Sequence, residues 1–226
     1  MTKKMQSKGI CLYCEQEMSK GGMSKHLSAC TKRWKVIEEA EGEKGAKAML
    51  YHLRAQDGYS GLFWLDLEIG GPNTLEDLDY YLRGIWLECC VHMSQFSIGG
   101  WRGDEIPMNR KIGMTFREGL ELTHIYDFGS SSKTVIKYVG RREGRPTTTH
   151  PIALMARNII PESKCIECER AAKWLCQECQ MKGSWGSLCD EHAKDHPCDE
   201  YGSPMPQVNS PRMGVCGYGG PANPPY

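Results

Sequence analysis

The spacing of cysteine and histidine residues limits the fold of this sequence more than any other feature. Eight potential metal ligands fall within 34 residues near the C-terminal end: Cys165, Cys168, Cys176, Cys179, Cys189, His192, His196 and Cys198. Two such residues separated by two others can hold one ion from a tight turn, and a closed zinc site has four ligands. Eight ligands therefore predict a two-zinc module over residues 161–200.

The order of these ligands is compatible with two pairings. It resembles the order in B-box and related cross-brace fingers, in which alternate ligand pairs share an ion. In that arrangement one ion is held by Cys165, Cys168, Cys189 and His192, and the other by Cys176, Cys179, His196 and Cys198. A sequential arrangement, in which the first four ligands hold one ion and the last four the other, satisfies the same count. Because the His196-x-Cys198 spacing departs from the usual pattern, Cys216 is an alternative last ligand.

A second cluster, near the N-terminal end, has the spacing of a single zinc site. Its candidate ligands are Cys11, Cys14, His26 and Cys30. The first two are separated by two residues, and the last two lie four apart, which places them on one face of a helix expected at about 23–40. The pattern resembles a C2HC zinc knuckle and predicts a finger over residues 1–35. Together with the C-terminal module, it predicts about three Zn²⁺ per chain.

Twelve cysteines would suggest disulfide bonds in a secreted protein, but the sequence favours a cytoplasmic location. It contains no run of about 18 apolar residues, the length needed to cross a bilayer. The opening Met1-Thr2-Lys3-Lys4 lacks the apolar stretch of a secretion signal. Disulfides are rare in a reducing compartment, so metal ligation explains the cysteines better, and no membrane partner is expected.

The charge of the chain is balanced overall but uneven along its length. Lysine plus arginine equals aspartate plus glutamate, at 28 each, yet residues 1–35 carry eight basic side chains and two acidic ones. This composition fits a phosphate-contacting patch, whose candidate residues are Lys20, Lys25, Lys32, Arg33 and Lys35. The alternative is a solvated face that keeps the finger in solution. Because no base-reading pattern accompanies the basic residues, sequence-specific recognition is not predicted.

The middle of the chain predicts an α+β domain over residues 61–160, with a small mixed sheet and packed helix. Residues 61–69 alternate apolar and polar side chains, as a half-buried strand does. Thr74 is the expected N-cap of the helix that follows. Residues 112–128 and 132–139 have the pattern of a β-hairpin.

Two less regular segments flank this domain. Residues 36–60 are acidic and predict a helical connector to the finger. Residues 201–226 are rich in glycine and proline, which disfavours regular structure. Within this tail, Arg212 and Cys216 are candidates to anchor the chain against the zinc module, and a flexible, exposed tail is the alternative.

Four segments of the middle domain occur in the order found in a known family. They are Leu65-Asp66-Leu67, the helix from Thr74 with its Trp86, the segment His92-Met93-Ser94-Gln95-Phe96, and Tyr126-Asp127-Phe128-Gly129. They resemble the Ri-plasmid open-reading-frame family, which includes TnpR-like passenger proteins of insertion elements. The resemblance covers about residues 61–140 and implies a compact α+β fold, a link to a plasmid or mobile element, and no settled biochemical activity. The tail over 209–218 is similar to C-terminal ends of zinc-bearing relatives.

Candidates for catalysis are few. His92, His124 and Asp127 are suited to acid–base chemistry only if the fold brings them together. His92 beside Cys89 and Cys90 could form a further metal site, but a buried neutral histidine next to buried thiols is the commoner arrangement. The sequence has no P-loop, dinucleotide fingerprint, nucleophile elbow or metalloprotease helix.

The leading hypothesis from the sequence is a zinc-binding, non-catalytic interaction or adaptor protein with a protein partner. The first alternative is an accessory factor that binds DNA or RNA by contacting phosphates through the basic finger. The second is an enzyme with a cryptic site in the central domain. The sequence does not predict an oligomeric state.

Overall fold

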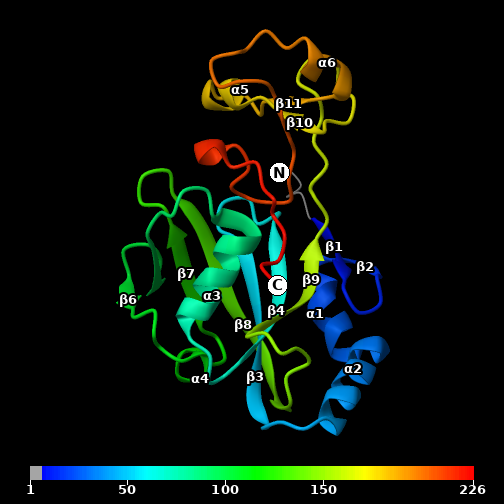
Figure 1. Ribbon diagram of the computed structural model, residues 1–226, viewed down its shortest axis with the longest axis vertical. Coiled ribbons are helices and arrows are strands. Elements are labelled where there is room, and N and C mark those ends of the chain that lie inside the picture. Colours follow the sequence, from blue (N-terminus) through cyan, green and yellow to red (C-terminus); the bar gives the residue numbers. More distant parts are fainter. Residues whose placement is uncertain (1–6) are drawn as a thin grey trace.

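A nine-stranded antiparallel sheet forms the centre of the computed structural model, which describes residues 7–226 (Figure 1). Its strands lie in the order β2-β1-β9-β4-β3-β8-β7-β5-β6. Their bounds are β1 Lys8–Cys11, β2 Glu17–Ser19, β3 Ala48–Asp57, β4 Trp64–Gly70, β5 Ser94–Ile98, β6 Asp104–Ile106, β7 Glu121–Tyr126, β8 Ser132–Gly144 and β9 Ile152–Asn158. The predicted α+β class is confirmed, although the sheet is larger than expected and antiparallel throughout.

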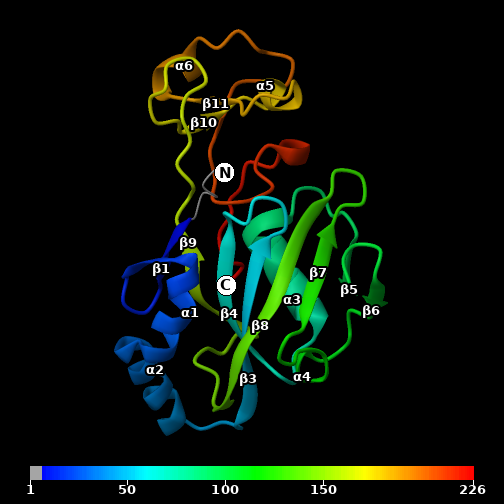
Figure 2. The ribbon, with the colours of Figure 1, turned by 180° about the vertical axis from the view of Figure 1, so that it is seen from behind.

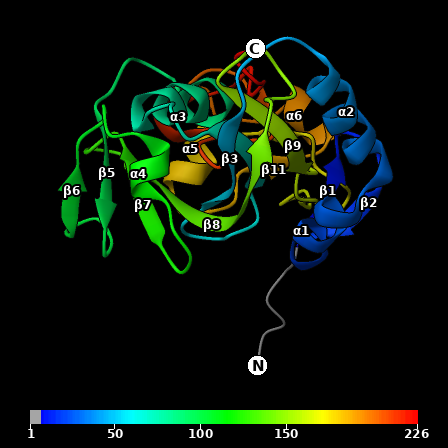
Figure 3. The ribbon, with the colours of Figure 1, turned by 90° about the horizontal axis from the view of Figure 1, so that it is seen from below.

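Helices cover one face of this sheet and one of its edges. They are α1 Lys20–Ala29, α2 Thr31–Gly42, α3 Leu75–Leu82 with a π-helical turn η1 Arg83–Leu87, and the short α4 Ile112–Thr115. Helix α3 lies in front of the strands in Figure 1 and behind them in Figure 2. Seen from below, α1 and α2 flank the β1–β2 edge, opposite the β5–β6 edge (Figure 3). No helix within residues 7–226 is long and apolar enough to cross a membrane.

The main core lies between α3 and the sheet. Thr74 caps α3 as predicted, and its hydroxyl accepts a hydrogen bond from the Asp77 backbone N–H while the Asp77 carboxylate accepts one from Thr74. The helix and η1 bury Leu75, Leu78 and Trp86 against the apolar face of β3 and β4.

The polar face of β4 is buried rather than solvated, so the strand is covered on both sides. Asp66 accepts hydrogen bonds from Arg54 at 2.6 and 3.1 Å, and its other partner is His52. Glu68 accepts from Arg33 of α2 at 3.0 Å and from Arg142 of β8. Charged neighbours thus allow two carboxylates to be buried beneath the N-terminal helices.

The helical prediction for residues 36–60 is wrong over most of its length. Helix α2 ends at Gly42, and Ala48–Asp57 form β3, which pairs with β4 on one side and β8 on the other. Leu53 and Ala55 are buried and alternate with less buried neighbours, a period of two. Pairing on both sides therefore outweighs local helix propensity.

Other element boundaries also differ from the sequence prediction. The helix expected at 23–40 is two helices, because Cys30 adopts an extended conformation between them. The hairpin strand expected at 112–128 begins only at Glu121, and Ile112–Thr115 are helical.

The C-terminal module has a sheet of its own and stands beyond the end of β9 (Figure 1). Its elements are β10 Trp174–Leu175, α5 Gln177–Met181, β11 Ser187–Leu188, α6 Asp190–Lys194 and β12 Met205–Pro206. After β12 the chain returns to the central domain, with a 3-10 turn η2 at Val215–Gly217. Arg212 is fully buried there and donates to Asp127 and Ser132 of the central domain, not to the zinc module as expected. The tail as a whole is held at both places, because β12 pairs with β10 and the Gln180 side chain donates to the Met213 carbonyl oxygen.

We predict that Gly9→Ala destabilises the join between the N-terminal segment and the sheet. A Cβ at Gly9 would lie 2.4 Å from the Trp64 ring and 2.5 Å from the Arg157 carbonyl oxygen. Overpacking of this kind costs about 1–3 kcal/mol, measurable by urea unfolding. Gly21→Ala is the matched control, because its Cβ meets nothing within 4 Å and helix propensity favours alanine. Equal stability of the two variants would contradict the prediction.

Candidate metal centres

The four N-terminal ligand candidates converge on one point. Cys11 ends β1, Cys14 follows in a tight turn in which Glu15 has a left-handed φ of 63°, and His26 and Cys30 come from the end of α1. Cys14 Sγ lies 3.2 Å from His26 Nε2, and all four ligand atoms lie within 4.8 Å of one another. Helix and turn therefore present a complete set of four ligands.

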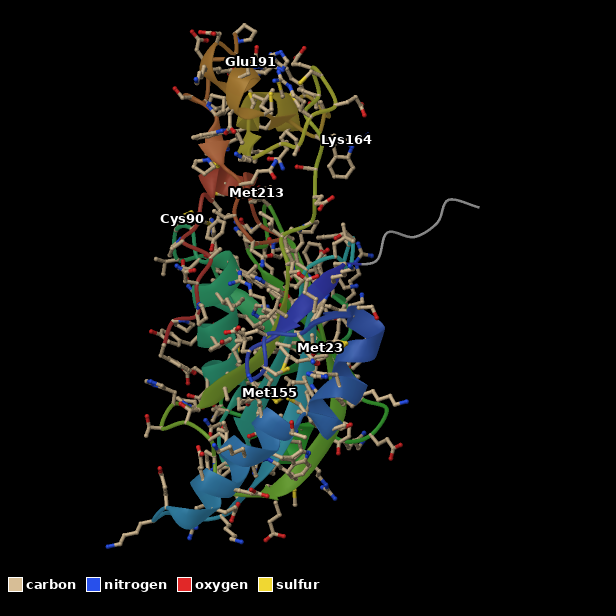
Figure 4. The ribbon with its side chains drawn as sticks, turned by 90° about the vertical axis from the view of Figure 1, so that its right-hand side faces the viewer. Met23, Cys90, Met155, Lys164, Glu191 and Met213 are labelled. Atoms are coloured by element: carbon tan, nitrogen blue, oxygen red, sulfur yellow. The ribbon has the colours of Figure 1, made fainter. Side chains whose placement is uncertain are left out.

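This cluster is packed against the sheet rather than free-standing. Trp64 of β4 and Met155 of β9 form a buried group with Met23, Leu27 and the ligand cysteines. In Figure 4, Met23 and Met155 are labelled on neighbouring elements of this region. Burial raises the pKa of Cys11 to about 11, so its metal-free thiol stays protonated at neutral pH. A bound cation would supply the positive charge that a buried thiolate needs.

The eight C-terminal ligand candidates form two groups with alternating membership. One group is Cys165, Cys168, Cys189 and His192; the other is Cys176, Cys179, His196 and Cys198. In the first, Cys165 Sγ lies 3.3 Å from His192 Nδ1; in the second, Cys179 Sγ lies 3.2 Å from His196 Nε2. The grouping follows the cross-brace pairing and not the sequential one. Cys198 completes the second group, at 3.7 Å from Cys179.

The electrostatic surroundings of the two groups differ. Arg170 Nε lies 3.1 Å from Cys168 Sγ, and this hydrogen bond lowers the pKa of that thiol. The His192 backbone N–H likewise lowers the pKa of Cys189. In the second group, burial raises the pKa of Cys179 to about 12. The first group is thus closer to the thiolate form that a metal requires.

The two tryptophans of the module have different positions. Trp174 is partly buried against the ligand cysteines, and its Nε1 donates to Asp190 at 2.9 Å. Trp185 has 85% of its surface exposed, so its ring does not fill the miniature core. Its loop, Lys182–Gly186, joins α5 to β11 and makes a turn through Gly183 and Gly186, both with positive φ.

A fourth group of ligand side chains was only partly anticipated from the sequence. Cys89, Cys90 and His92 follow η1, and Cys216 reaches them from the tail. Cys216 is therefore not a ligand of the C-terminal module. His92 is partly exposed, which contradicts the expectation of a buried histidine. Local spacing could not have predicted Cys216 as the fourth member, because it lies 124 residues from His92.

The candidate catalytic residues do not share one pocket. His92 Nε2 lies 3.4 Å from Asp127 Oδ2. His124 is fully buried elsewhere, with its Nε2 2.7 Å from Asp79 Oδ1 and its ring against Phe96. Asp79 was not singled out from the sequence; its place on α3 gives it the spacing of a core-facing position.

The basic residues of the N-terminal segment fall into two classes. Lys25, Lys32 and Lys35 are exposed on α1 and α2. Lys20 donates to the Gly61 carbonyl oxygen at 2.8 Å. Arg33 is buried and paired with Glu68, so its guanidinium is committed to the fold.

Comparison with known proteins assigns no family and no function to this chain. No family model matches this chain, and no curated protein matches it. A crystal structure of a protein of unknown function from Methanosarcina mazei Go1 superposes with a TM-score of 0.40 and 16% sequence identity. The match covers 46% of this chain and 66% of that chain. The resemblance to the Ri-plasmid open-reading-frame family stays a prediction.

We predict that Asp79→Asn destabilises the protein by about 1–3 kcal/mol at pH 7, because buried His124 loses a charged partner. Burial alone would raise the pKa of Asp79, but the hydrogen bond and charge of His124, the hydrogen bond from Ser94 and the charge of Arg83 together outweigh it, and the pKa is lowered. A lowered carboxyl pKa stabilises the fold above the unfolded value of about 4, and this contribution is lost as the pH falls through the folded value.

The difference in unfolding free energy between this variant and the wild type should therefore narrow in acid. Urea unfolding at several pH values measures it. Exposed Asp104→Asn is the control and should change stability by less than about 0.5 kcal/mol. A deficit for Asp79→Asn that stayed constant down to the lowest pH would show that the carboxylate charge is not responsible.

Proposed function

We propose that this chain is a zinc-binding, non-catalytic interaction protein. Three of its Cys/His groups hold structural Zn²⁺: the N-terminal one and the two of the C-terminal module. The observation that supports this most directly is that twelve side chains form three complete sets of four, each within 4.8 Å. Sulfur and imidazole ligands in sets of four favour zinc, and a filled set leaves no position for a substrate.

The absence of disulfide bonds among the cysteines is consistent with zinc binding. All twelve cysteines are unpaired, so disulfides do not hold the ends of the chain together. The buried group of the C-terminal module consists of three cysteines and Leu188. So small a core gives little hydrophobic stabilisation, and small metal-binding modules draw most of their folding free energy from the ion.

The C-terminal module also supports the assignment of a protein partner. Met181 and Trp185 are 64% and 85% exposed at the α5 end, and both come from one short stretch of chain. Exposed tryptophan and methionine are enriched at protein interfaces, where a large ring buries much area at little entropic cost. The metal ions would hold this stretch rigid, and the central sheet would position it.

A second candidate function is nucleic-acid binding by the N-terminal segment. It is favoured by one observation: exposed Lys25, Lys32 and Lys35 share the α1–α2 surface with Trp34, which is 45% exposed. Lysines beside an aromatic ring are suited to a single-stranded nucleic acid, through phosphate contacts and base stacking. Arg33, which was expected in this patch, is not available to it.

The pairing of ligands predicts a specific pattern of metal loss. Cys168→Ser and Cys189→Ser remove ligands of the same ion, so the double variant should lose no more zinc than either single one. Cys168→Ser with Cys179→Ser should lose two ions, because these residues belong to different groups. Elemental analysis of zinc per chain after gel filtration measures both.

Ser203→Ala, an exposed position in the same module, is the control and should keep all its zinc. The opposite pattern, in which the first pair loses two ions and the second pair one, would establish the sequential pairing instead. Wild-type protein prepared with zinc but containing no transition metal would overturn the proposed function.

Gel-shift titrations with single-stranded DNA and RNA separate the two candidates. If the second is correct, changing Lys25, Lys32 and Lys35 together to Gln should reduce the salt dependence of log K by roughly 0.7 for each phosphate that is no longer neutralised. Changing Lys164, Lys173 and Lys182 to Gln removes equal charge from ion-paired positions and should have no such effect. The protein-partner proposal predicts no shift for the wild type even at about 50 mM salt.

A further inference from the structure

The fourth Cys/His group lies where the central domain meets the returning tail. Cys89 and Cys90 follow η1, His92 precedes β5, and Cys216 belongs to η2. In Figure 4, Cys90 is labelled at this junction and Met213 close by in the tail. The four ligand atoms lie within 4.8 Å of one another, as in the other three groups.

We propose that Cys89, Cys90, His92 and Cys216 form a further zinc site, which fastens the C-terminal segment to the central domain. This site goes beyond the proposed function, because it stabilises neither the finger nor the C-terminal module. On binding, three thiols each release a proton to solvent and His92 enters as a neutral imidazole. The chemistry is that of a soft divalent ion with three sulfur ligands and one nitrogen.

The distances within the group match those of the groups with a recognised zinc spacing. Cys90 Sγ lies 3.4 Å from both Cys89 Sγ and Cys216 Sγ, and 3.0 Å from His92 Nε2. Cys216 Sγ lies 3.7 Å from the same nitrogen. Corresponding ligand contacts in the other groups range from 3.2 to 3.8 Å. Zinc–sulfur bonds of about 2.3 Å and zinc–nitrogen bonds of about 2.0 Å give tetrahedron edges of this order.

The surroundings of the group supply the second set of contacts that metal sites need. Arg212 is completely buried and directs Nη2 and Nε to Cys89 Sγ, at 3.3 and 3.4 Å. Asp127 accepts from Arg212 at 2.7 Å and so holds the guanidinium in place beside Cys89. Three thiolates around one divalent ion give the site a net negative charge. The buried guanidinium of Arg212 offsets part of this charge on the side of the site that is least accessible to solvent.

Two residues at the site have an unfavourable backbone conformation, and the convergence of the four ligand side chains explains it. Val91, between two ligands, has a φ of 59°, and Cys216 has a φ of 52°. A left-handed conformation costs a non-glycine residue about 1–3 kcal/mol and persists only when its surroundings enforce it. Val91 is 82% exposed and gains no burial in exchange. Convergence of the ligands on an ion would stabilise both turns.

The exposure of this group distinguishes it from the other three. Cys90 and Cys216 are exposed, whereas each of the other groups contains at least one buried cysteine. An ion here would exchange with solvent without unfolding of either domain. We therefore expect this site to release its zinc to a chelator before the others do.

The test uses the full chain purified reduced and loaded with zinc. Wild-type protein should contain four zinc ions per chain, and the Cys216→Ser variant three. When zinc is transferred to a colorimetric chelator, the wild type should show a fast phase that the variant lacks. Cys90→Ser, which removes a ligand of the central domain, should have the same effect. The double variant Cys90→Ser with Cys216→Ser should lose no more zinc than either single variant. Met93→Ser is the control: an exposed residue beside the ligands that carries no ligand atom.

The outcomes separate this site from the proposed function. Four ions falling to three in both single variants, with Met93→Ser unchanged, would support the site. Three ions in wild type and in Cys216→Ser alike would overturn the fourth site and leave the proposed function intact. A Cys90–Cys216 disulfide in protein kept reduced, detected by alkylation and mass measurement, would also overturn it. Fewer than three ions in the wild type would instead contradict the proposed function.

Discussion

The apolar groups buried at the two ends of this chain are small and include cysteines that are candidate metal ligands, and this constraint shapes the rest of the architecture. Thiols make up most of the buried group in the C-terminal module, so hydrophobic burial contributes little there. The N-terminal ligands have a second source of support, because Trp64 and Met155 of the sheet pack against them. One end of the chain thus shares a core with the central domain, whereas the other has only a small buried group and a short sheet of its own.

Buried charged residues on one face of the sheet connect it to the N-terminal helices. Glu68 contacts arginines from α2 and β8, while Asp66 contacts Arg54 and His52 of the neighbouring strand. Removing one partner of such a network would leave an uncompensated charge, so the network constrains which arrangement of helices and strands is possible. The opposite face is conventional, with Leu75, Leu78 and Trp86 packed on aliphatic strand residues.

Sequence reasoning identified the candidate ligands best where they are close together in the chain. The N-terminal set and the eight C-terminal residues converge as predicted, and the α3 cap at Thr74 is present. Sequence reasoning failed where contacts between distant segments determine the structure. Ala48–Asp57 form a strand because neighbours pair on both sides, and Cys216 joins Cys90 across 126 residues of sequence separation. The choice between cross-brace and sequential pairing needed coordinates for the same reason.

The position of Arg212 has a consequence for how the protein is made. This side chain fills the space beside Tyr126 and Asp127, yet it is synthesised after the entire C-terminal module. A nascent chain leaving the ribosome therefore holds an incomplete central domain, in which Asp127 lacks its arginine partner, until the segment around Arg212 emerges. Loss of the segment around Arg212 to a protease would therefore damage the central domain, although the C-terminal module separates the two in the sequence.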